Sequence, residues 1–206
     1  MMDHNDFFRT EHPLENERAR LEPLTASHFE KLLPVALNKE LWEYTSVTVT
    51  DEADFRKYFD QALVEKKMQS AYPYAIYDKQ AGQYAGSTRF GNIDLGHKRA
   101  EIGWTWYHPA LQRTGINKNC KFLLLSYAFD VVDLNRVELK TSLTNFKSQG
   151  AMLKIGAVKE GVLRRHMVNA NGTLRDSVYF SFIKEEWDDI KQEFFPEFIH
   201  KATNGN

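Results

Sequence analysis

The sequence predicts a layered α/β (α+β) domain with a mixed, mostly antiparallel central sheet of about seven strands flanked by helices. Three observations predict this class. Segments with strand-like alternation interchange with segments of helical periodicity along the 206 residues. Their order is strand, two helices, three strands, helix, strand, helix and two strands, which mixes neighbours able to pair antiparallel with helical crossovers. No linker-like stretch divides the segments, so one domain is expected.

The first strand is predicted over 18–24, where charged and apolar side chains alternate as in a half-buried strand. Thr25 is placed to cap a helix over 26–37, in which apolar residues recur at helical spacing. A second helix, capped by Asp51 or Thr50, is predicted to reach about residue 68.

The remaining elements follow from the same two periodicities. Strands are expected at 72–77, 84–92, 99–107, 136–141, 158–168 and 175–183. Helices are expected at 116–132, at 145–155 and from about residue 185. The last two strands are predicted to form a hairpin, because the turn-rich stretch Asn169–Gly172 separates them.

Domain limits and composition restrict the class of protein. We expect the domain to span 17–190, preceded by a loose polar arm over 1–16 and followed by an extension over 191–206. The single cysteine, Cys120, excludes an internal disulfide framework and favours a reducing compartment. The first residues lack the apolar core of a signal peptide, so a cytoplasmic protein is expected.

Charge argues against two classes of partner. The formal net charge is −1 and no long basic run occurs, so neither nucleic acid nor an anionic membrane is an expected partner. The longest nearly apolar run, 122–132, is too short to span a bilayer. The seven histidines show no metal-ligand spacing, so no metal is expected.

The strongest functional signal lies where the strand 99–107 gives way to the helix beginning at Ile116. The first turn of a helix has unpaired N–H groups and the positive end of the helix dipole, which together favour an anion. Gly115 allows the backbone to approach that anion closely, and Arg113 and Lys118 add cationic donors. The pattern predicts a site for a phosphorylated cofactor, although an ordinary strand-to-helix turn gives the same pattern.

The residues Gln112-Arg113-Thr114-Gly115-Ile116-Asn117 resemble the pyrophosphate-binding signature of the GCN5-related N-acetyltransferases. That signature is Gln or Arg, two residues, Gly, one residue, then Gly or Ala. Asn117 departs from it at the last position but still offers its backbone N–H. The resemblance implies acetyl-CoA as cosubstrate and the following binding residues: Tyr107, Gln112, Arg113, Thr114, Gly115, Ile116, Asn117, Lys118 and Asn145.

A second group of motifs resembles the Rim-type (RimJ/RimL-like) ribosomal-protein N-acetyltransferases. The strand containing Arg136 is followed by Asn145, two residues and Ser148, then by Ile-Gly-Ala at 155–157 and Glu-Gly at 160–161, with Ala157 in place of the usual Phe. The resemblance assigns Asn145 to the pantetheine arm and makes Ser148 the general acid. Many acetyltransferases use a Tyr seven residues after that Asn, but here Met152 stands there and has no proton to donate.

The general base is expected to be a carboxylate on a central strand. Glu101 precedes the aromatic residues Trp104, Trp106 and Tyr107, among which desolvation would raise its pKa. Glu138 on the next strand and a water relay are the alternatives. Backbone N–H groups near the end of the strand 99–107, where it splays from its neighbour, are expected to polarise the acetyl carbonyl.

Several other side chains have two readings. Trp42, Tyr44, Trp104 and Trp106 line an acceptor pocket or belong to the core. His108 relays a proton beside the turn or is structural. Cys120 lies on the apolar side of its helix, which disfavours a covalent acetyl-cysteine.

These features predict an acetyl-CoA-dependent N-acetyltransferase that transfers the acetyl group directly in a ternary complex. The acceptor is an amine, either a protein N-terminus or a small molecule. A CoA-binding or interaction module of the same fold without turnover is the alternative, because Asn117 and Met152 depart from the family pattern. A monomer and a homodimer both fit.

Overall fold

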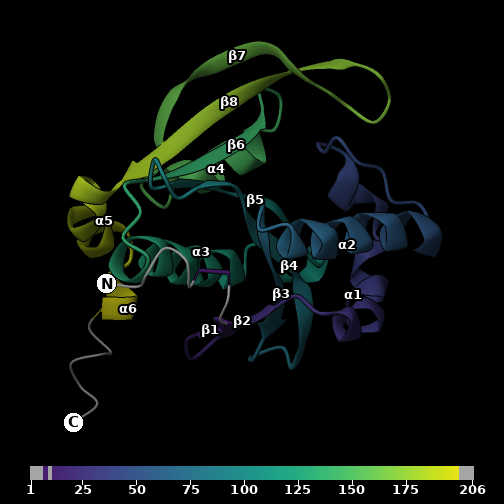
Figure 1. The fold of residues 1–206 in the computed structure, drawn as a ribbon, viewed down its shortest axis with the longest axis horizontal. Coiled ribbons are helices and arrows are strands. Elements are labelled where there is room, and N and C mark those ends of the chain that lie inside the picture. The colour runs from purple at the N-terminus through teal and green to yellow at the C-terminus, as the bar shows by residue number, and fades with distance from the viewer. Residues whose placement is uncertain (1–6, 9–10, 200–206) are drawn as a thin grey trace.

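The structure, a computed structural model, describes residues 7–8 and 11–199, arranged around one sheet (Figure 1). Its strands lie in the order β1-β2-β3-β4-β5-β6-β8-β7 and pair antiparallel, except for the parallel pair β5–β6. The strands are β1 Leu14–Glu15, β2 Ala19–Pro23, β3 Tyr72–Asp78, β4 Gln83–Asp94, β5 Arg99–Tyr107, β6 Arg136–Ser142, β7 Val158–Val168 and β8 Leu174–Ile183.

The helices follow the predicted segments closely. They are α1 Phe29–Ala36, α2 Glu52–Lys67, α3 Ile116–Ser126, α4 Phe146–Leu153, α5 Trp187–Phe194 and α6 Pro196–Ile199. Asp51, one of the two expected caps, begins α2 by accepting a hydrogen bond at Oδ1 from the Asp54 N–H at 2.9 Å. No helix in the part of the chain that the structure describes is long and apolar enough to cross a membrane.

The N-terminal segment differs from the expected loose arm. Leu14 and Glu15 form β1 against β2, and the Phe7 side chain is fully buried among Tyr72, Phe90 and Tyr127. Burial of this large aromatic side chain stabilises the packed position of the segment, although the composition of the segment is mostly polar. Residues 1–6 and 9–10 of the predicted arm lie outside the described residues.

The C-terminal boundary of the domain was expected at residue 190. It falls inside α5, and the Phe195 side chain beyond it is completely buried in the main core. The predicted helix 116–132 ends as α3 at Ser126 and continues as a π-helical turn over 127–131. This wider turn carries Asp130, whose Oδ1 accepts hydrogen bonds from Trp187 Nε1 of α5 and from Lys191 Nζ.

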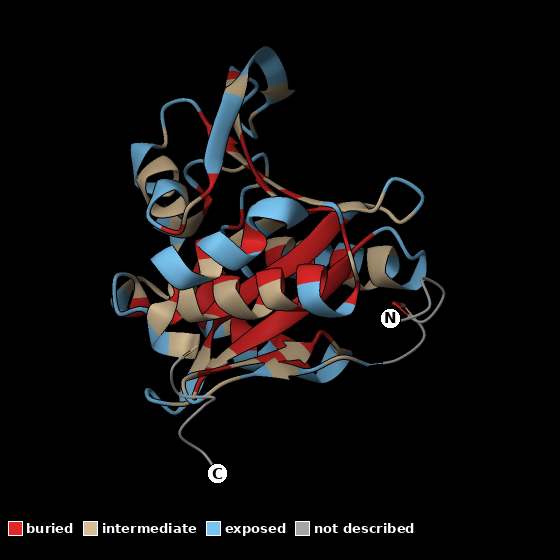
Figure 2. Cartoon of the chain, turned by 90° about the vertical axis from the view of Figure 1, so that its left-hand side faces the viewer, coloured by how far each residue is buried: buried red, intermediate tan, exposed pale blue. Residues whose placement is uncertain are grey.

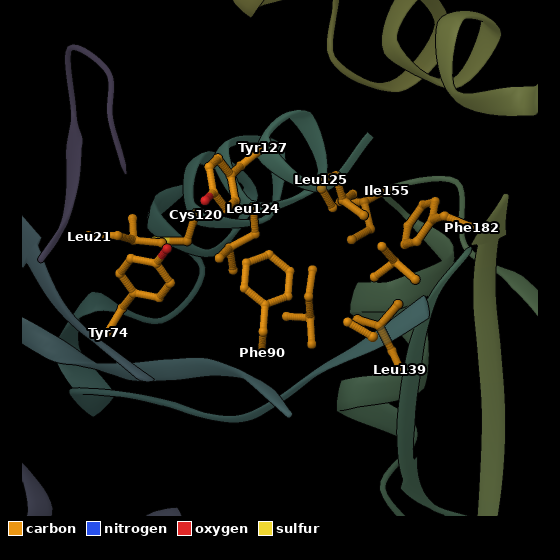
Figure 3. Close-up of a cluster of buried hydrophobic side chains, with 14 of the residues drawn as sticks. Leu21, Tyr74, Phe90, Cys120, Leu124, Leu125, Tyr127, Leu139, Ile155 and Phe182 are labelled. Atoms are coloured by element: carbon orange, nitrogen blue, oxygen red, sulfur yellow. The ribbon is translucent and has the colours of Figure 1, made fainter. Parts of the chain in front are cut away.

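Two cores lie on opposite faces of the sheet. The main core joins α3 to the sheet, with Phe90 of β4 beneath Leu124 and with Leu139 and Phe182 farther along the sheet (Figure 3). The second core, on the other face, joins α1 and α2 to β3 and β5; Figure 2 shows the buried strands between exposed helix faces. In β6 and β8 alternate side chains enter the main core, so the intervening ones face away from α3.

The parallel strands β5 and β6 stay together only at one end. Their pairing covers Arg99↔Arg136, Ala100↔Val137 and Glu101↔Glu138, after which β5 continues to Tyr107 without a register to β6. The later part of β5 therefore has no pairing with β6, which is the separation of strands expected near the end of the segment 99–107.

Candidate active site

The turn before α3 has the geometry of an anion site. Gly115 is the N-cap of α3 with φ 98° and ψ −12°, a left-handed conformation that glycine adopts without strain. Arg113, Thr114 and Gly115 are exposed. The N–H groups of the first turn have no partner within the helix and point out of its N-terminal end. A Cβ on Gly115 would meet only the Arg18 Nη1 atom, at 3.5 Å.

Arg18, which sequence reasoning did not assign to the site, holds this turn in place through hydrogen bonds to Thr114, on the side away from the expected anion. Its Nη1 donates to the Thr114 carbonyl oxygen, and its Nη2 donates to Thr114 Oγ1 at 2.9 Å. Nη2 also pairs with Asp78 Oδ2 at 3.1 Å, and the Asp78 side chain is fully buried. Because a peptide unit is planar and trans, a Thr114 carbonyl held toward Arg18 directs the Gly115 N–H the opposite way.

The beginning of α4 lies next to the turn at residues 112–118 that was predicted to bind the cofactor, called the cofactor turn below. Gln112 donates from Nε2 to the Tyr107 carbonyl oxygen at 3.2 Å, and its Oε1 accepts a hydrogen bond from Lys147 Nζ of α4. Asn145 caps α4, since its Oδ1 accepts from the Ser148 N–H at 3.0 Å. The structure thus brings the two predicted motifs together, with Asn145 and Ser148 both half-buried.

Two predicted cofactor residues direct their side chains elsewhere. The Tyr107 ring is buried in the main core, and that burial raises the pKa of its phenol well above the usual value. Lys118 Nζ pairs with Glu197 Oε1 of α6 at 2.5 Å, beside the ring of Phe195. Tyr107 can therefore reach a cofactor only through its backbone, and the Lys118 ammonium is already engaged.

Glu101 lies on the face of the sheet opposite α3, in surroundings that differ from those expected. Its side chain is buried, and Oε2 accepts hydrogen bonds from Asn92 Nδ2 at 2.7 Å and Lys140 Nζ at 2.8 Å. An apolar aromatic pocket was expected around this carboxylate. The structure shows two polar partners there; Tyr107 lies in the main core, and the Trp104 ring lies over Gly91, the register partner of Glu101. The ammonium of Lys140 compensates the buried carboxylate instead.

The alternative base, Glu138, is held by two guanidinium groups. Its Oε1 lies 2.9 Å from Arg136 Nε and 3.8 Å from Arg99 Nη1. Arg136 also binds Glu160 through both Nη atoms. Glu138 therefore belongs to a chain of ion pairs along the strands, whereas Glu101 has one cationic partner.

Four aromatic residues were expected to line an acceptor pocket or to belong to the core, and two of them belong to the core. Trp42 and Trp106 are buried in the second core, whereas Tyr44 and Trp104 remain partly exposed. Trp104 has φ 49° at an irregularity in the β4–β5 register, and its ring lies over Gly91, where a Cβ would come within 2.3 Å.

His108 has the structural role: its Nδ1 accepts from the Ala110 N–H at 3.1 Å and caps the short helical turn Pro109–Leu111.

Two ionisable side chains of α3, Cys120 and Lys121, are buried. Burial raises the pKa of the Cys120 thiol to about 12, which disfavours a thiolate nucleophile. Lys121 was not singled out from the sequence because it reads as an ordinary helix residue. It is buried, its Nζ lies 3.4 Å from Thr105 Oγ1 on β5, and burial lowers its pKa to about 8. Within the described residues no group of three or more potential metal ligands occurs.

Comparison with known proteins agrees with this geometry. The family described as "Acetyltransferase (GNAT) domain" matches residues 18–158. "Putative ribosomal N-acetyltransferase YdaF" of Bacillus subtilis (strain 168) is 34% identical over 116 residues, which are 56% of this chain and 61% of that protein. This match spans less than two thirds of the relative.

Solved structures share the fold over most of the chain. A GCN5-related N-acetyltransferase from Brucella melitensis has a TM-score of 0.82 at 29% identity, over 90% of this chain and 84% of the other. The microcin C7 self-immunity acetyltransferase MccE, in complex with acetyl-CoA and AMP, has a TM-score of 0.73 at 25% identity, over 82% of this chain and 93% of the other.

Proposed function

The chain belongs to the GNAT acetyltransferase family and is an N-acetyltransferase, and from this premise we propose that it moves the acetyl group of acetyl-CoA directly to an amine. The observation that carries the proposal is the exposed, left-handed Gly115 turn at the N-terminus of α3, which follows β5 beyond the part of that strand paired with β6. The match to YdaF and the Asn145–Ser148 pair support a Rim-type enzyme.

The residues present fit the cosubstrate. The first-turn N–H groups of α3, together with the exposed Arg113, would hold the pyrophosphate. The edge of β5 that lacks a ladder to β6 would hold the pantetheine arm, with Asn145 on the other side. When bound, acetyl-CoA supplies an acyl thioester that is activated toward amines.

Two side chains would move protons. Both hydrogen bonds to Glu101 reach Oε2, so we assign Oε1 to accept the proton of the acceptor ammonium. Ser148 Oγ would donate a proton to the departing sulfur, because Met152 cannot. Burial raises the pKa of the Cys120 thiol to about 12, which supports direct transfer in a ternary complex over a covalent acetyl-cysteine.

The test is product formation read by mass spectrometry, with acetyl-CoA and a panel of peptide N-termini and small amines. We expect at least one acetylated amine and a matching amount of free CoA. Glu101→Gln should slow turnover most at neutral pH and less at high pH, where more of the amine is already deprotonated. Glu138→Gln is the matched control on the neighbouring strand.

An equal loss in both variants, or no pH dependence in the loss, would refute the role of Glu101. Binding of acetyl-CoA without any acetylated product would favour the alternative, a module that binds CoA without turnover. No feature of the described geometry favours that alternative by itself.

A further inference from the structure

Arg175 stands apart from the other buried cations on the face of the sheet opposite α3. Val178, Phe180 and Phe182 of β8 enter the main core, so Arg175 and Tyr179 face the other way by alternation. Glu101 and Lys140 lie on this same face. Only 8% of Arg175 is exposed, which is unusual for a residue beside the turn of a hairpin whose partner strand β7 is mostly exposed.

The guanidinium of Arg175 has partners but no anion. Nη1 donates to the Tyr44 carbonyl oxygen at 3.1 Å, and Nη2 lies 2.8 Å from the Met167 sulfur and 3.5 Å from Ser177 Oγ. Its Nε is buried without a hydrogen bond. A guanidinium has five N–H donors, so several remain unused.

Other buried or half-buried cations near this face are neutralised. Arg89 pairs with Glu65 at 2.6 Å, and Lys140 pairs with Glu101 at 2.8 Å. Across the described residues, Arg175 forms no ion pair. A buried guanidinium remains charged, so this arrangement is costly until an anion arrives.

The anion that Arg175 lacks would lie near Glu101, the proposed base. Arg175 Nη2 reaches Ser177 Oγ at 3.5 Å, and Ser177 and Tyr179 follow Arg175 on the same face of β8. Lys140, which pairs with Glu101 at 2.8 Å, lies 6.0 Å from the centre of the Tyr179 ring, so Tyr179 lies between the two charged groups along this face. Burial lowers the pKa of Arg175, and the charge of Glu101 acts in the opposite direction, in agreement with this placement. One molecule can thus bring an ammonium to Glu101 and an anion to Arg175.

We propose that Arg175 binds a carboxylate of the acceptor, so that the enzyme selects amines that also carry a carboxylate. A carboxylate matches the planar fork of a guanidinium with two parallel hydrogen bonds. The group is either the α-carboxylate of a free amino acid or the side chain of an acidic residue near a peptide N-terminus. This inference rests on the proposed acetyl transfer and adds the substrate class to it.

The experiment compares acceptors that differ in this charge, with kcat/KM expressed per free amine because amidation also lowers the pKa of the acceptor ammonium. One arm uses L-alanine and L-alaninamide; the other uses C-terminally amidated peptides with Asp or Asn at the second position. The native enzyme should prefer the charged member of at least one pair by roughly 10- to 100-fold in kcat/KM, the scale of a charge-assisted hydrogen bond. The arm that shows the preference identifies the source of the carboxylate.

Arg175→Met should abolish that preference while leaving the affinity for acetyl-CoA unchanged. Arg164→Met, which removes an exposed charge from the same hairpin, is the control and should keep it. Arg175→Lys keeps the charge without the fork and should retain part of the preference, which covers the case that the methionine variant fails to fold.

A readout of stability separates this role from a structural one. In the free enzyme no anionic side chain among the described residues compensates the buried charge of Arg175. Arg175→Met should therefore leave the melting temperature unchanged or raise it. A lower melting temperature with an unchanged preference would mean that Arg175 only clamps the Tyr44 carbonyl, and would overturn the proposal. Equal turnover of charged and neutral acceptors by the native enzyme would also overturn it.

If no amine is acetylated, that result refutes the proposed function but not the role of Arg175. Calorimetric titration of the same acceptor pairs into the CoA-saturated protein then tests Arg175 separately. The charged member should bind more tightly to the native protein than to Arg175→Met. Equal binding to both proteins would contradict the inference without reference to catalysis.

Discussion

Replacing Arg18 by Met tests whether the cofactor turn is held in place from behind. The change keeps the aliphatic stem but removes the hydrogen bonds to Thr114 and the ion pair to Asp78. Breaking a buried ion pair costs about 3–5 kcal/mol. Here the cost should be about 2–3 kcal/mol, because Arg18 is 21% exposed and Asp78 Oδ1 keeps hydrogen bonds from the Gln80 and Ala81 N–H groups.

The same variant should bind acetyl-CoA more weakly. With the Thr114 carbonyl released, the Gly115 N–H is no longer oriented toward the anion, and losing one hydrogen bond to a charged group costs about 1.5 kcal/mol, or roughly tenfold in Kd. Urea unfolding gives the stability and calorimetric titration gives the Kd. Arg20→Met is the matched control, since Arg20 is 40% exposed and pairs with Glu22 of its own strand.

The control should lose less than about 1 kcal/mol and keep its Kd. Thr114→Val should weaken binding in the native background but add little to Arg18→Met, because the two residues act through one contact. A folded Arg18→Met variant with the native Kd would refute the reasoning.

Two further predictions concern the site. Ser148→Ala should lower kcat by about 10²-fold while acetyl-CoA affinity stays nearly intact, the scale of losing a positioned acid; unchanged kcat would remove Ser148 from the mechanism. Lys121→Met should stabilise the protein at pH 7 by up to about 3 kcal/mol, since burial lowers the Lys121 pKa from 10.5 to about 8 and the unfolded chain binds the proton more tightly. The gain should shrink as pH rises from about 8 to 10.5, where native Lys121 is neutral; urea unfolding of both proteins across that range measures it, and a gain that grows with pH would contradict the burial argument. Both proteins should carry Cys120→Ser, because burial raises the Cys120 pKa while the charge of Lys121 lowers it, so the two groups titrate together.

Local patterns predicted the elements well where the sequence carries its own signals. The strand 99–107 has the predicted limits, and Asp51 begins α2 as one of the two expected caps. Gly115 was predictable because only glycine adopts its conformation easily at a helix start. Residues 7–8 were not, because two aromatic residues in a polar segment do not show whether the core has room for them.

Contacts distant in sequence account for what was missed in the site. Arg18 meets Thr114 across 96 residues, and Lys140 meets Glu101 across 39. Neither pairing leaves a periodic signal, since each depends on the strand order of the sheet. The polar surroundings of Glu101 and the unpaired state of Arg175 therefore became visible only when the sheet was assembled.

Stabilisation of the folded protein by acetyl-CoA tests the central claim most directly. At a hundredfold excess over its Kd, a ligand that binds only the folded state adds about 2.7 kcal/mol and raises the melting temperature. We predict this shift for the native protein and its loss in Gly115→Val, because a β-branched residue at φ 98° is strained and its side chain would press on Arg18, so the turn that presents the N–H groups must move. No shift of the native protein with millimolar acetyl-CoA would contradict the account.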